Sequence, residues 1–382
     1  MCWEGVFAAD FTLEHVRRRC GYLSRELQNR GEPCLVAYDT RFMANLFARD
    51  IYRMLERCSV PVSLASTPSP LPAVYNALVQ RRASTALVVS ARNKPYWYNG
   101  LVLLKPAGAD TLRWPEHQDL EPSGNDSSFP LPPESFVQGE TPGVGTTLDL
   151  RSLYLEMLVR HVDVELIRRS TMTIFVDPIH GTTAGYLPAI IGEQSQTMAI
   201  EINRETDPLF NKFTPLPVAA NLVRLRKLVR ESDSHLGLAF SADGTALGMV
   251  DKNGEQVDQL EITLLLASYL ARQYRQKGTV VVPRPSGGEK LVTMAGLETW
   301  QKTHGLKLEL VENANARIAE KLAQSPPDLL IGGTSEGGLI MGPYSFYPDA
   351  LLAGLLMVEL VARSAGNLRL HLDELRAGLA KE

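Results

Sequence analysis

Apolar residues recur along the chain at two different spacings. Over 12–30 they lie three or four positions apart and follow Thr12, which can cap a helix, so this segment is predicted to be helical. The short, unbroken apolar run Cys34–Tyr38 predicts a buried strand instead. The same two patterns continue to the end of the chain. They predict helices at 44–58, 73–81, 150–168, 181–191, 217–231, 261–277, 294–304, 314–322, 348–364 and 368–381, and strands at 60–64, 85–90, 172–176, 198–201, 236–240, 279–282, 307–311 and 329–332.

Alternation of strands and helices is typical of α/β folds whose sheets are mainly parallel. It is interrupted by 106–147, a segment rich in proline and glycine that predicts an irregular excursion at a domain boundary. The alternation restarts twice after that. We therefore expect three similar α/β domains, at 1–147, 148–255 and 256–382.

The composition narrows the function classes. The 382 residues include 39 Lys and Arg against 43 Asp and Glu, a net charge of −4 that gives no reason to expect a nucleic-acid partner. The longest apolar stretch, 350–362, contains Gly354 and Glu359 and is shorter than the roughly 18 residues of a membrane span, so no membrane association is expected. The start of the chain does not read as a secretory signal, and the four cysteines have no metal or disulfide spacing. A cytoplasmic protein with reduced thiols is predicted.

Several short motifs carry a resemblance to a known family. The opening 3–16, the strand end Val36–Arg41, Thr67–Pro70, Tyr98–Gly100, Asp177–Gly181 and Gly332–Gly342 resemble corresponding turns of the α-D-phosphohexomutase superfamily, the phosphoglucomutases and phosphomannomutases. This resemblance implies three consecutive α/β/α domains with mixed, mainly parallel sheets. The chain stops where the family's third domain ends, so no fourth domain is expected.

The family's phosphoserine loop, T-A-S-H-N-P, corresponds here to Ser90–Pro95. Arg92 takes the place of the serine that carries the phosphoryl group, and a guanidinium has only donors and stays protonated. Asn93 and Lys94 replace the histidine and asparagine. Ser90 has a hydroxyl, but it lies two residues from the nucleophile position, about 6–7 Å along an extended chain. We expect a degenerate loop, with Ser90 capping its turn.

The resemblance places the family's magnesium loop, D-G-D-x-D-R, at Ser241–Ala246. Only Asp243 remains of the three carboxylates, with the hydroxyls of Ser241 and Thr245 at the flanking positions. Because magnesium is held by hard oxygen ligands, often carboxylates, we expect a vestigial loop, no metal and no cofactor.

The family's sugar-contacting loop, G-E-x-S-G, corresponds to Gly333–Gly337. Thr334, Ser335 and Glu336 still offer polar groups, and together with Arg41 they are candidate substrate-binding residues. The segment Arg284–Gly288 resembles the loop of the family's fourth domain, but it lies inside the third block and is interpreted as coincidence.

An exchange of charge accompanies the change in the first loop. The family's opening arginine is Glu4 here, and its phosphoserine is Arg92. One hypothesis is that these two side chains pair and fill the former phosphate site; the other is that each faces solvent on its own.

Changes at all four family sites favour a catalytically inactive relative, a pseudoenzyme with a regulatory, scaffolding or sugar-phosphate-sensing role. It would bind a protein partner or a sugar phosphate, and it could form a homo-oligomer. Aromatic residues at 96–98 are one candidate partner surface, and packing on a neighbouring loop is the other interpretation. The alternative function is a sugar-phosphate mutase, an intramolecular phosphotransferase, with a rebuilt active site or a fourth domain supplied by another polypeptide.

Overall fold

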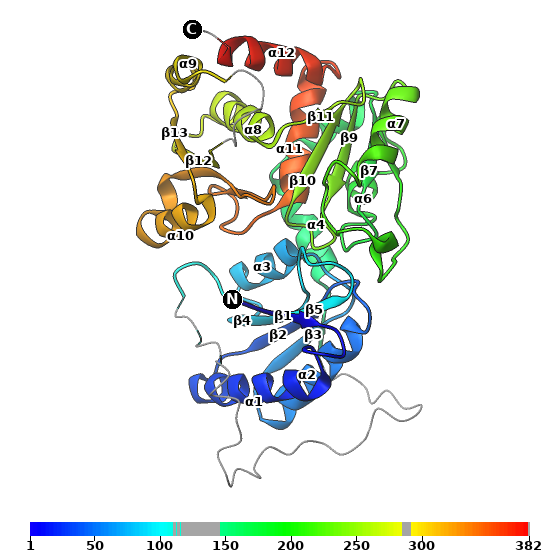
Figure 1. Cartoon of the computed structure of the whole chain (residues 1–382), viewed down its shortest axis with the longest axis vertical. Coiled ribbons are helices and arrows are strands. Elements are labelled where there is room, and N and C mark those ends of the chain that lie inside the picture. The colour runs from blue at the N-terminus through cyan, green and yellow to red at the C-terminus, as the bar shows by residue number, and fades with distance from the viewer. Residues whose placement is uncertain (110–111, 113–114, 116–145, 285–291, 381–382) are drawn as a thin grey trace. The chain divides into compact units, whose positions relative to one another are not determined.

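The computed structural model describes residues 1–109, 112, 115, 146–284 and 292–380 (Figure 1). The chain forms two compact units, Met1–Tyr154 and Leu155–Glu382. Most of the irregular segment predicted at 106–147, and residues 285–288 of the segment resembling the fourth family loop, lie outside the described residues.

The first unit is a six-stranded sheet of strand order β1-β5-β4-β2-β3-β6, covered by α1 and α2 on one face and by α3 on the other (Figure 1). The three contacts among β4, β2, β3 and β6 are parallel, and β5 is antiparallel to both β4 and β1. The elements are β1 Cys2–Val6, α1 Leu13–Arg30, β2 Cys34–Tyr38, α2 Ala44–Arg57, β3 Val62–Ala65, α3 Leu71–Val79, β4 Thr85–Val89, β5 Tyr98–Leu104 and β6 Thr147–Leu148.

Helix α1 shows why the apolar pattern produces this layer. Thr12 caps it, because its hydroxyl accepts a hydrogen bond from the His15 N–H at 3.2 Å. Its predicted apolar face, from Val16 to Leu27, is buried against α2 and the sheet. Gly31 ends the helix in the left-handed conformation with φ 63°.

The second unit contains two sheets. One has the order β11-β10-β9-β7-β8 and the other β13-β12-β14-β15, and each combines parallel pairs with an antiparallel edge. Helix α4 (Leu150–Arg160) begins in the first unit and ends in the second. The remaining elements are α5 Val164–Arg169, β7 Thr173–Asp177, α6 Tyr186–Ile191, β8 Met198–Glu201, α7 Val223–Glu231, β9 Leu236–Phe240, β10 Leu247–Asp251, β11 Gln256–Val257, α8 Gln259–Gln273, β12 Thr279–Pro283, α9 Met294–His304, β13 Lys307–Val311, α10 Ala314–Gln324, β14 Leu329–Gly333, β15 Leu339–Met341, α11 Ala350–Arg363 and α12 Leu368–Leu379.

Helix α11 joins the two sheets of the second unit. It contacts β9 and β10 of one sheet and β15 of the other, and it is buried along nearly its whole length. At Gly354 a Cβ would lie 3.0 Å from the Phe240 ring, so a small residue lets the helix approach β9 closely. No single helix in the described part of the chain has the length and hydropathy to cross a membrane; the bent pair α11 and α12 meets the criterion only jointly.

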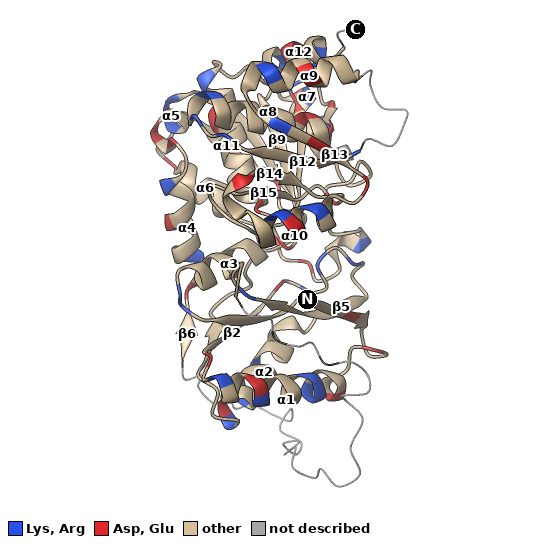
Figure 2. Cartoon of the chain, turned by 90° about the vertical axis from the view of Figure 1, so that its left-hand side faces the viewer, with Lys and Arg blue, Asp and Glu red and all other residues tan. Residues whose placement is uncertain are grey.

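Charged residues lie on the outer helix faces (Figure 2), and some of them pair within their own helix. Arg18 pairs with Glu14 on α1, and Arg317 lies 2.7 Å from Glu320 on α10. Exposed pairs of this kind contribute up to about 1 kcal/mol each. Basic residues of these helices also pair between elements: Arg17 of α1 lies 2.7 Å from Asp50 of α2, and Arg317 also lies 2.7 Å from Glu309 of β13.

Three predicted helices differ from the structure by five residues or more, or are divided into two. The helix predicted at 150–168 is two helices, because the chain turns after Arg160 and the Asp163 carboxylate then caps α5 through the Leu166 N–H at 3.0 Å. The helices predicted from 181 and 217 begin at Tyr186 and Val223. The sequence pattern extended both helices across turns that are polar or contain glycine.

Candidate functional site

In the first unit, the loop between β4 and β5 is held from within by Arg41. Its guanidinium donates to the carbonyls of Arg92, Lys94, Pro95 and Tyr98 at 2.6–3.0 Å, and its Nε lies 3.3 Å from an Asp39 carboxylate oxygen. Arg41 is only 3% exposed. Arg41 therefore fixes the conformation of the loop. Its contact with a substrate stays a prediction.

Ser90 and Arg92 form a tight turn at the start of this loop. Ser90 is fully buried, and its Oγ accepts a hydrogen bond from the Arg92 N–H at 3.0 Å, as the predicted cap requires. Arg92 has a φ of 50°, and Asn93 beside it is half-buried. In this conformation the Ser90 hydroxyl is covered by protein, so a phosphoryl group can reach it only if the turn opens.

Glu4 faces the same loop from β1. Its carboxylate lies 3.7 Å from the Lys94 ammonium and 3.4 Å from the Cys2 thiol. Burial and then Glu4 raise the pKa of Cys2 to about 12, and the Arg92 charge opposes this rise. Arg92 therefore lies near enough to β1 to influence its groups. The pairing of Glu4 with Arg92 itself stays a prediction.

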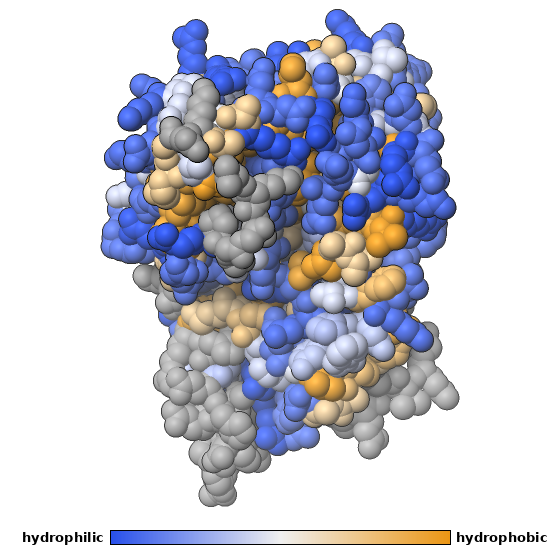
Figure 3. Space-filling view, turned by 45° about the horizontal axis from the view of Figure 1, so that its top comes forward, coloured by the Kyte–Doolittle hydropathy of each residue, from blue (hydrophilic) through white to orange (hydrophobic). Residues whose placement is uncertain are grey.

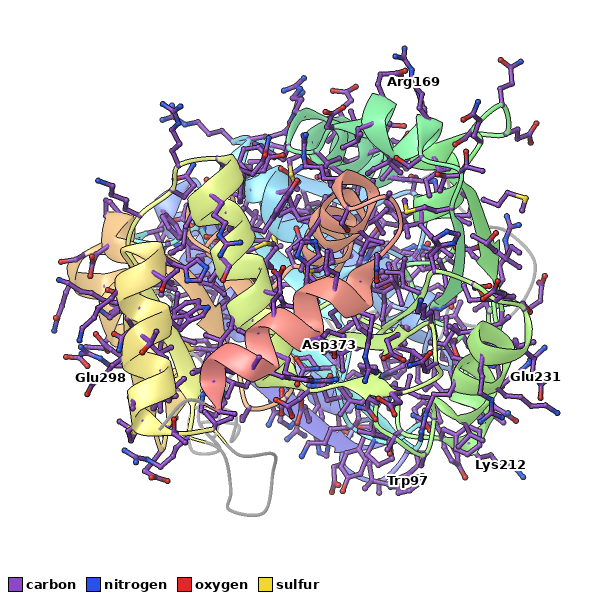
Figure 4. The ribbon with its side chains drawn as sticks, turned by 90° about the horizontal axis from the view of Figure 1, so that it is seen from above. Trp97, Arg169, Lys212, Glu231, Glu298 and Asp373 are labelled. Carbon is purple, nitrogen blue, oxygen red and sulfur yellow. The ribbon has the colours of Figure 1, made fainter. Side chains whose placement is uncertain are left out.

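Two side chains of the loop are well exposed. Lys94 is 50% exposed, and Trp97, labelled in Figure 4, is 48% exposed beside Tyr96, with ring centroids 4.9 Å apart. A fixed loop with one exposed ammonium suits an anionic ligand. The exposed indole is compatible with the predicted partner surface at 96–98, which stays a prediction.

The second predicted loop lies in the other unit, after β9. Asp243 is 1% exposed, and its Oδ1 accepts from the Ser241 hydroxyl at 2.6 Å and from the Thr245 hydroxyl at 2.7 Å. Its Oδ2 is buried and has no hydrogen-bond partner among the described residues. The loop is therefore a closed polar turn built around one carboxylate with one oxygen left over.

A neighbouring turn at Asp177–Gly181 positions this loop. The Asp177 carboxylate accepts from the Ile179 N–H at 2.8 Å and from Asn203 at 2.9 Å. The Thr182 N–H and hydroxyl then both donate to the Ala242 carbonyl, at 2.8 and 2.7 Å. Thr182 and Asn203 were missed by the sequence reasoning, because neither lies in a recognisable motif.

Gly181→Ala is expected to destabilise the second unit by about 1–3 kcal/mol. A Cβ at this position would lie 2.2 Å from the Ala242 Cα, so the loop that carries Asp243 must move. Chemical denaturation measures the loss. Gly305→Ala is unsuitable as a control because its φ is 63°, whereas Gly378→Ala on α12 meets no atom within 4 Å and should be neutral or stabilising. Equal stability of both variants would contradict the close approach.

The third predicted loop meets the second one. The Leu247 N–H donates to the Gly337 carbonyl at 3.1 Å, and the Gln259 amide donates to the Leu247 carbonyl at 2.7 Å. Thr334 is half-buried and accepts from the Gly338 N–H, whereas Ser335 and Glu336 are exposed. The structure thus brings the predicted metal and sugar loops together, and Gln259, which no motif marks, fixes their contact.

Family models match nearly the whole chain in three consecutive segments. They are described as phosphoglucomutase/phosphomannomutase alpha/beta/alpha domain I at residues 3–119, domain II at 152–254 and domain III at 258–378. The predicted domain boundaries at 147 and 255 stay predictions.

Curated relatives are sugar-phosphate mutases by name. The phosphoglucosamine mutase of Marinobacter nauticus is 27% identical over 356 residues, covering 91% of this chain and 72% of the relative. That of Methylococcus capsulatus is 26% identical over 352 residues, covering 92% and 73%. A solved phosphoglucomutase/phosphomannomutase family protein from Burkholderia thailandensis, 19% identical, superposes with a TM-score of 0.75 over 100% of this chain and 78% of its own.

These relatives contradict the expectation that the chain has no cofactor. The mutases of this family depend on magnesium. The prediction rested on two missing carboxylates. Magnesium, however, is often bound through only one or two carboxylates, because waters and substrate phosphate supply its further ligands.

The second loop can hold such an ion with fewer protein ligands than the family's three carboxylates. No group of three His, Cys, Asp or Glu side chains in the described ranges is arranged to hold a metal. Asp243 Oδ2, however, is an orphaned buried carboxylate oxygen, and the Thr245 hydroxyl oxygen keeps lone pairs after donating its proton. Ser241 Oγ already accepts from the Thr245 and Ala246 N–H groups, so it is not a ligand in this conformation. Asp243 would therefore hold the ion, which, when bound, polarises a phosphoryl oxygen.

The three domain matches, the named relatives and the three mixed sheets with their flanking helices agree with the motif resemblance. The predicted fold class is thereby confirmed. This chain belongs to the α-D-phosphohexomutase superfamily.

Proposed function

We propose that this protein is a sugar-phosphate mutase that binds a hexose or hexosamine phosphate and whose first loop has been rebuilt. The proposal depends chiefly on the Arg41 arrangement, in which one buried guanidinium binds four carbonyls of the loop. A loop fixed in this way presents the Lys94 ammonium to an anion without an ordering cost at the moment of binding. The named relatives support the sugar phosphate as the ligand, and the free thiols of all four cysteines support a cytoplasmic location.

Turnover by this protein needs an acceptor for the phosphoryl group. Ser90 has the only hydroxyl in the Ser90–Pro95 loop, and it becomes available once the Arg92 N–H releases it. The Ser90 Oγ–P bond then forms as the donor O–P bond breaks, and the serine proton passes to the donor oxygen. Transfer to the second sugar hydroxyl reverses these changes and restores Ser90.

A second candidate function is sugar-phosphate binding without turnover, as in a sensor or regulatory protein that also binds a protein partner. The burial of Ser90 and the guanidinium at the nucleophile position favour it. Both candidates use the same ligand, and they differ only in whether a phosphoryl group moves.

The test combines titration calorimetry with a coupled assay for interconversion of glucosamine 1- and 6-phosphate, with magnesium and the matching bisphosphate. We expect binding of the monophosphate and a turnover that Ser90→Ala abolishes and Ser84→Ala, a serine outside the loop, leaves intact. Removing magnesium with EDTA should abolish the same turnover. Binding without turnover would assign the second candidate. Absence of both, repeated with glucose and mannose phosphates, would overturn the proposal.

A further inference from the structure

A cavity of about 380 Å³ lies within the second unit, among helices α8, α9, α11 and α12. Figure 4 looks down on α8, α9 and α12, with Glu298 labelled near α9 and Asp373 on α12. The surrounding face is mainly polar, and apolar residues show between the polar ones (Figure 3). The cavity is lined by none of the residues of the second and third loops, and its volume falls within the range typical of small-molecule sites.

The floor of this cavity is apolar and fixed. Leu265, Leu360 and Leu375 line it together with Trp300. The Trp300 indole N–H donates to the Ser268 hydroxyl at 3.0 Å, so the ring is held in one orientation. One wall is held equally firmly, because Arg363 is bonded to the buried Glu359. The site is therefore preformed for an apolar body.

Two opposite charges line the same cavity without pairing. Arg272 on α8 and Glu374 on α12 are both exposed residues. They make no ion pair with each other, and neither makes a hydrogen bond or an ion pair within the described ranges. His371 lies near enough to both residues for their charges to act on it. Its Nε2 is buried and has no hydrogen-bond partner among the described residues. Burial lowers the pKa of His371, so its ring is neutral at pH 7 and offers one further polar atom.

Space for a ligand is kept at Gly378 on α12, which also lines the cavity. A Cβ built there would meet no atom within 4 Å, although glycine in a helix interior costs about 0.5–1 kcal/mol relative to alanine. A larger side chain would fit the helix and would fill the cavity instead.

We propose that this cavity binds a small zwitterion with an apolar body, the chemistry of a free apolar amino acid. Its carboxylate pairs with Arg272, its ammonium with Glu374, and its side chain lies on the floor formed by Trp300 and the leucines. This ligand uses both unpaired charges, which a simple anion or cation would not. The site is separate from the proposed sugar-phosphate site and does not depend on it.

The experiment is titration calorimetry with L-phenylalanine and three analogues that each lack one feature. Phenylpropionate lacks the ammonium, phenethylamine lacks the carboxylate, and glycine lacks the apolar body. Because a hydrogen bond to a charged group contributes about 1.5–3 kcal/mol, we expect each truncated analogue to bind at least tenfold more weakly than phenylalanine. Equal binding of phenylalanine and its truncated analogues would overturn the proposal. So would no binding of phenylalanine, leucine or tryptophan.

Variants assign the charges. Arg272→Gln should weaken phenylalanine about tenfold and leave phenethylamine unchanged, whereas Glu374→Gln should weaken phenylalanine and leave phenylpropionate unchanged. Gly378→Leu should abolish binding while the protein keeps its thermal stability. Arg275→Gln, an exposed arginine just beyond α8 that does not line the cavity, is the matched control. Phenylalanine affinity unaffected by Arg272→Gln or by Gly378→Leu would contradict the assignment, and sugar-phosphate binding measured on the same samples would be unaffected in either case.

Discussion

Glu359→Ala is expected to lower the unfolding temperature of the second unit by about 10 °C. The side chain is 0% exposed on α11, and removing one partner from a buried charge network costs about 3–5 kcal/mol. For a folded unit of this size each kcal/mol corresponds to about 2–4 °C. Differential scanning calorimetry of the whole chain measures the change.

The size of this effect follows from the number of groups that Glu359 satisfies. Its carboxylate accepts from the hydroxyls of Tyr269 at 2.6 Å and Tyr274 at 2.9 Å, and from Arg363 at 3.0 Å. It also accepts from the backbone N–H of Asp163 at 3.1 Å, which ties the start of α5 to α11. Burial and the carboxylate together raise the pKa of both tyrosines, so they remain protonated donors at pH 7. Alanine leaves all four donors without this acceptor.

Glu156→Ala on α4 is the control for this prediction. Glu156 is 65% exposed and lies 3.7 Å from Arg160, so its loss should change stability by less than about 1 kcal/mol. Glu359→Gln keeps one acceptor oxygen and should fall between the two. An unfolding temperature for Glu359→Ala within 2 °C of the Glu156→Ala value would show that the network adds nothing to stability.

The sequence pattern predicted the parallel strands well, including the edge strands β8 and β13, and missed the strands that pair only in antiparallel fashion. Cys34–Tyr38 has the predicted bounds, since buried parallel strands are unbroken apolar runs. Strands β1, β5, β10, β11 and β15, and the two-residue parallel strand β6, were not predicted as strands. Apart from β6, each is antiparallel to every strand that it pairs with. Strands β5, β10, β11 and β15 each follow a partner strand along the chain, whereas β1 pairs with β5, which lies far from it in the sequence. The pattern alone has no signal for such pairing.

Site residues that lie in a motif could be predicted from the sequence, whereas those whose role depends on tertiary contacts could not. Ser90, Asp243 and Thr334 were located by resemblance, and the structure places each at a loop. The role of Arg41 as the organiser of the first loop was not predictable, because its four acceptors are backbone carbonyls more than 50 residues away. The contact between the second and third loops through Gln259 was hidden for the same reason.

Arg41→Ala is expected to release the first loop and to abolish sugar-phosphate binding, with a loss of about 3–5 kcal/mol in the stability of the first unit. Alanine removes the donors that hold the carbonyls of Arg92, Lys94, Pro95 and Tyr98, and it removes the buried charge beside Asp39. An unfixed loop must pay the ordering cost when a ligand binds, so affinity falls even though Lys94 is still present. Hydrogen exchange of the amides at 91–98 and calorimetric titration measure the two effects.

Two further variants separate positioning from charge. Arg41→Lys keeps the positive charge but replaces the planar fork of five donors by a single ammonium, so it should still leave the loop exchanging faster than in the native protein. Arg57→Ala, at the exposed end of α2, removes an arginine from the same unit without touching the loop and should change neither measurement. If Arg41→Lys matched the native protein in amide exchange and affinity, one buried charge would suffice to order the loop. The shape of the guanidinium would then be irrelevant, and the four carbonyl acceptors would not define the first site.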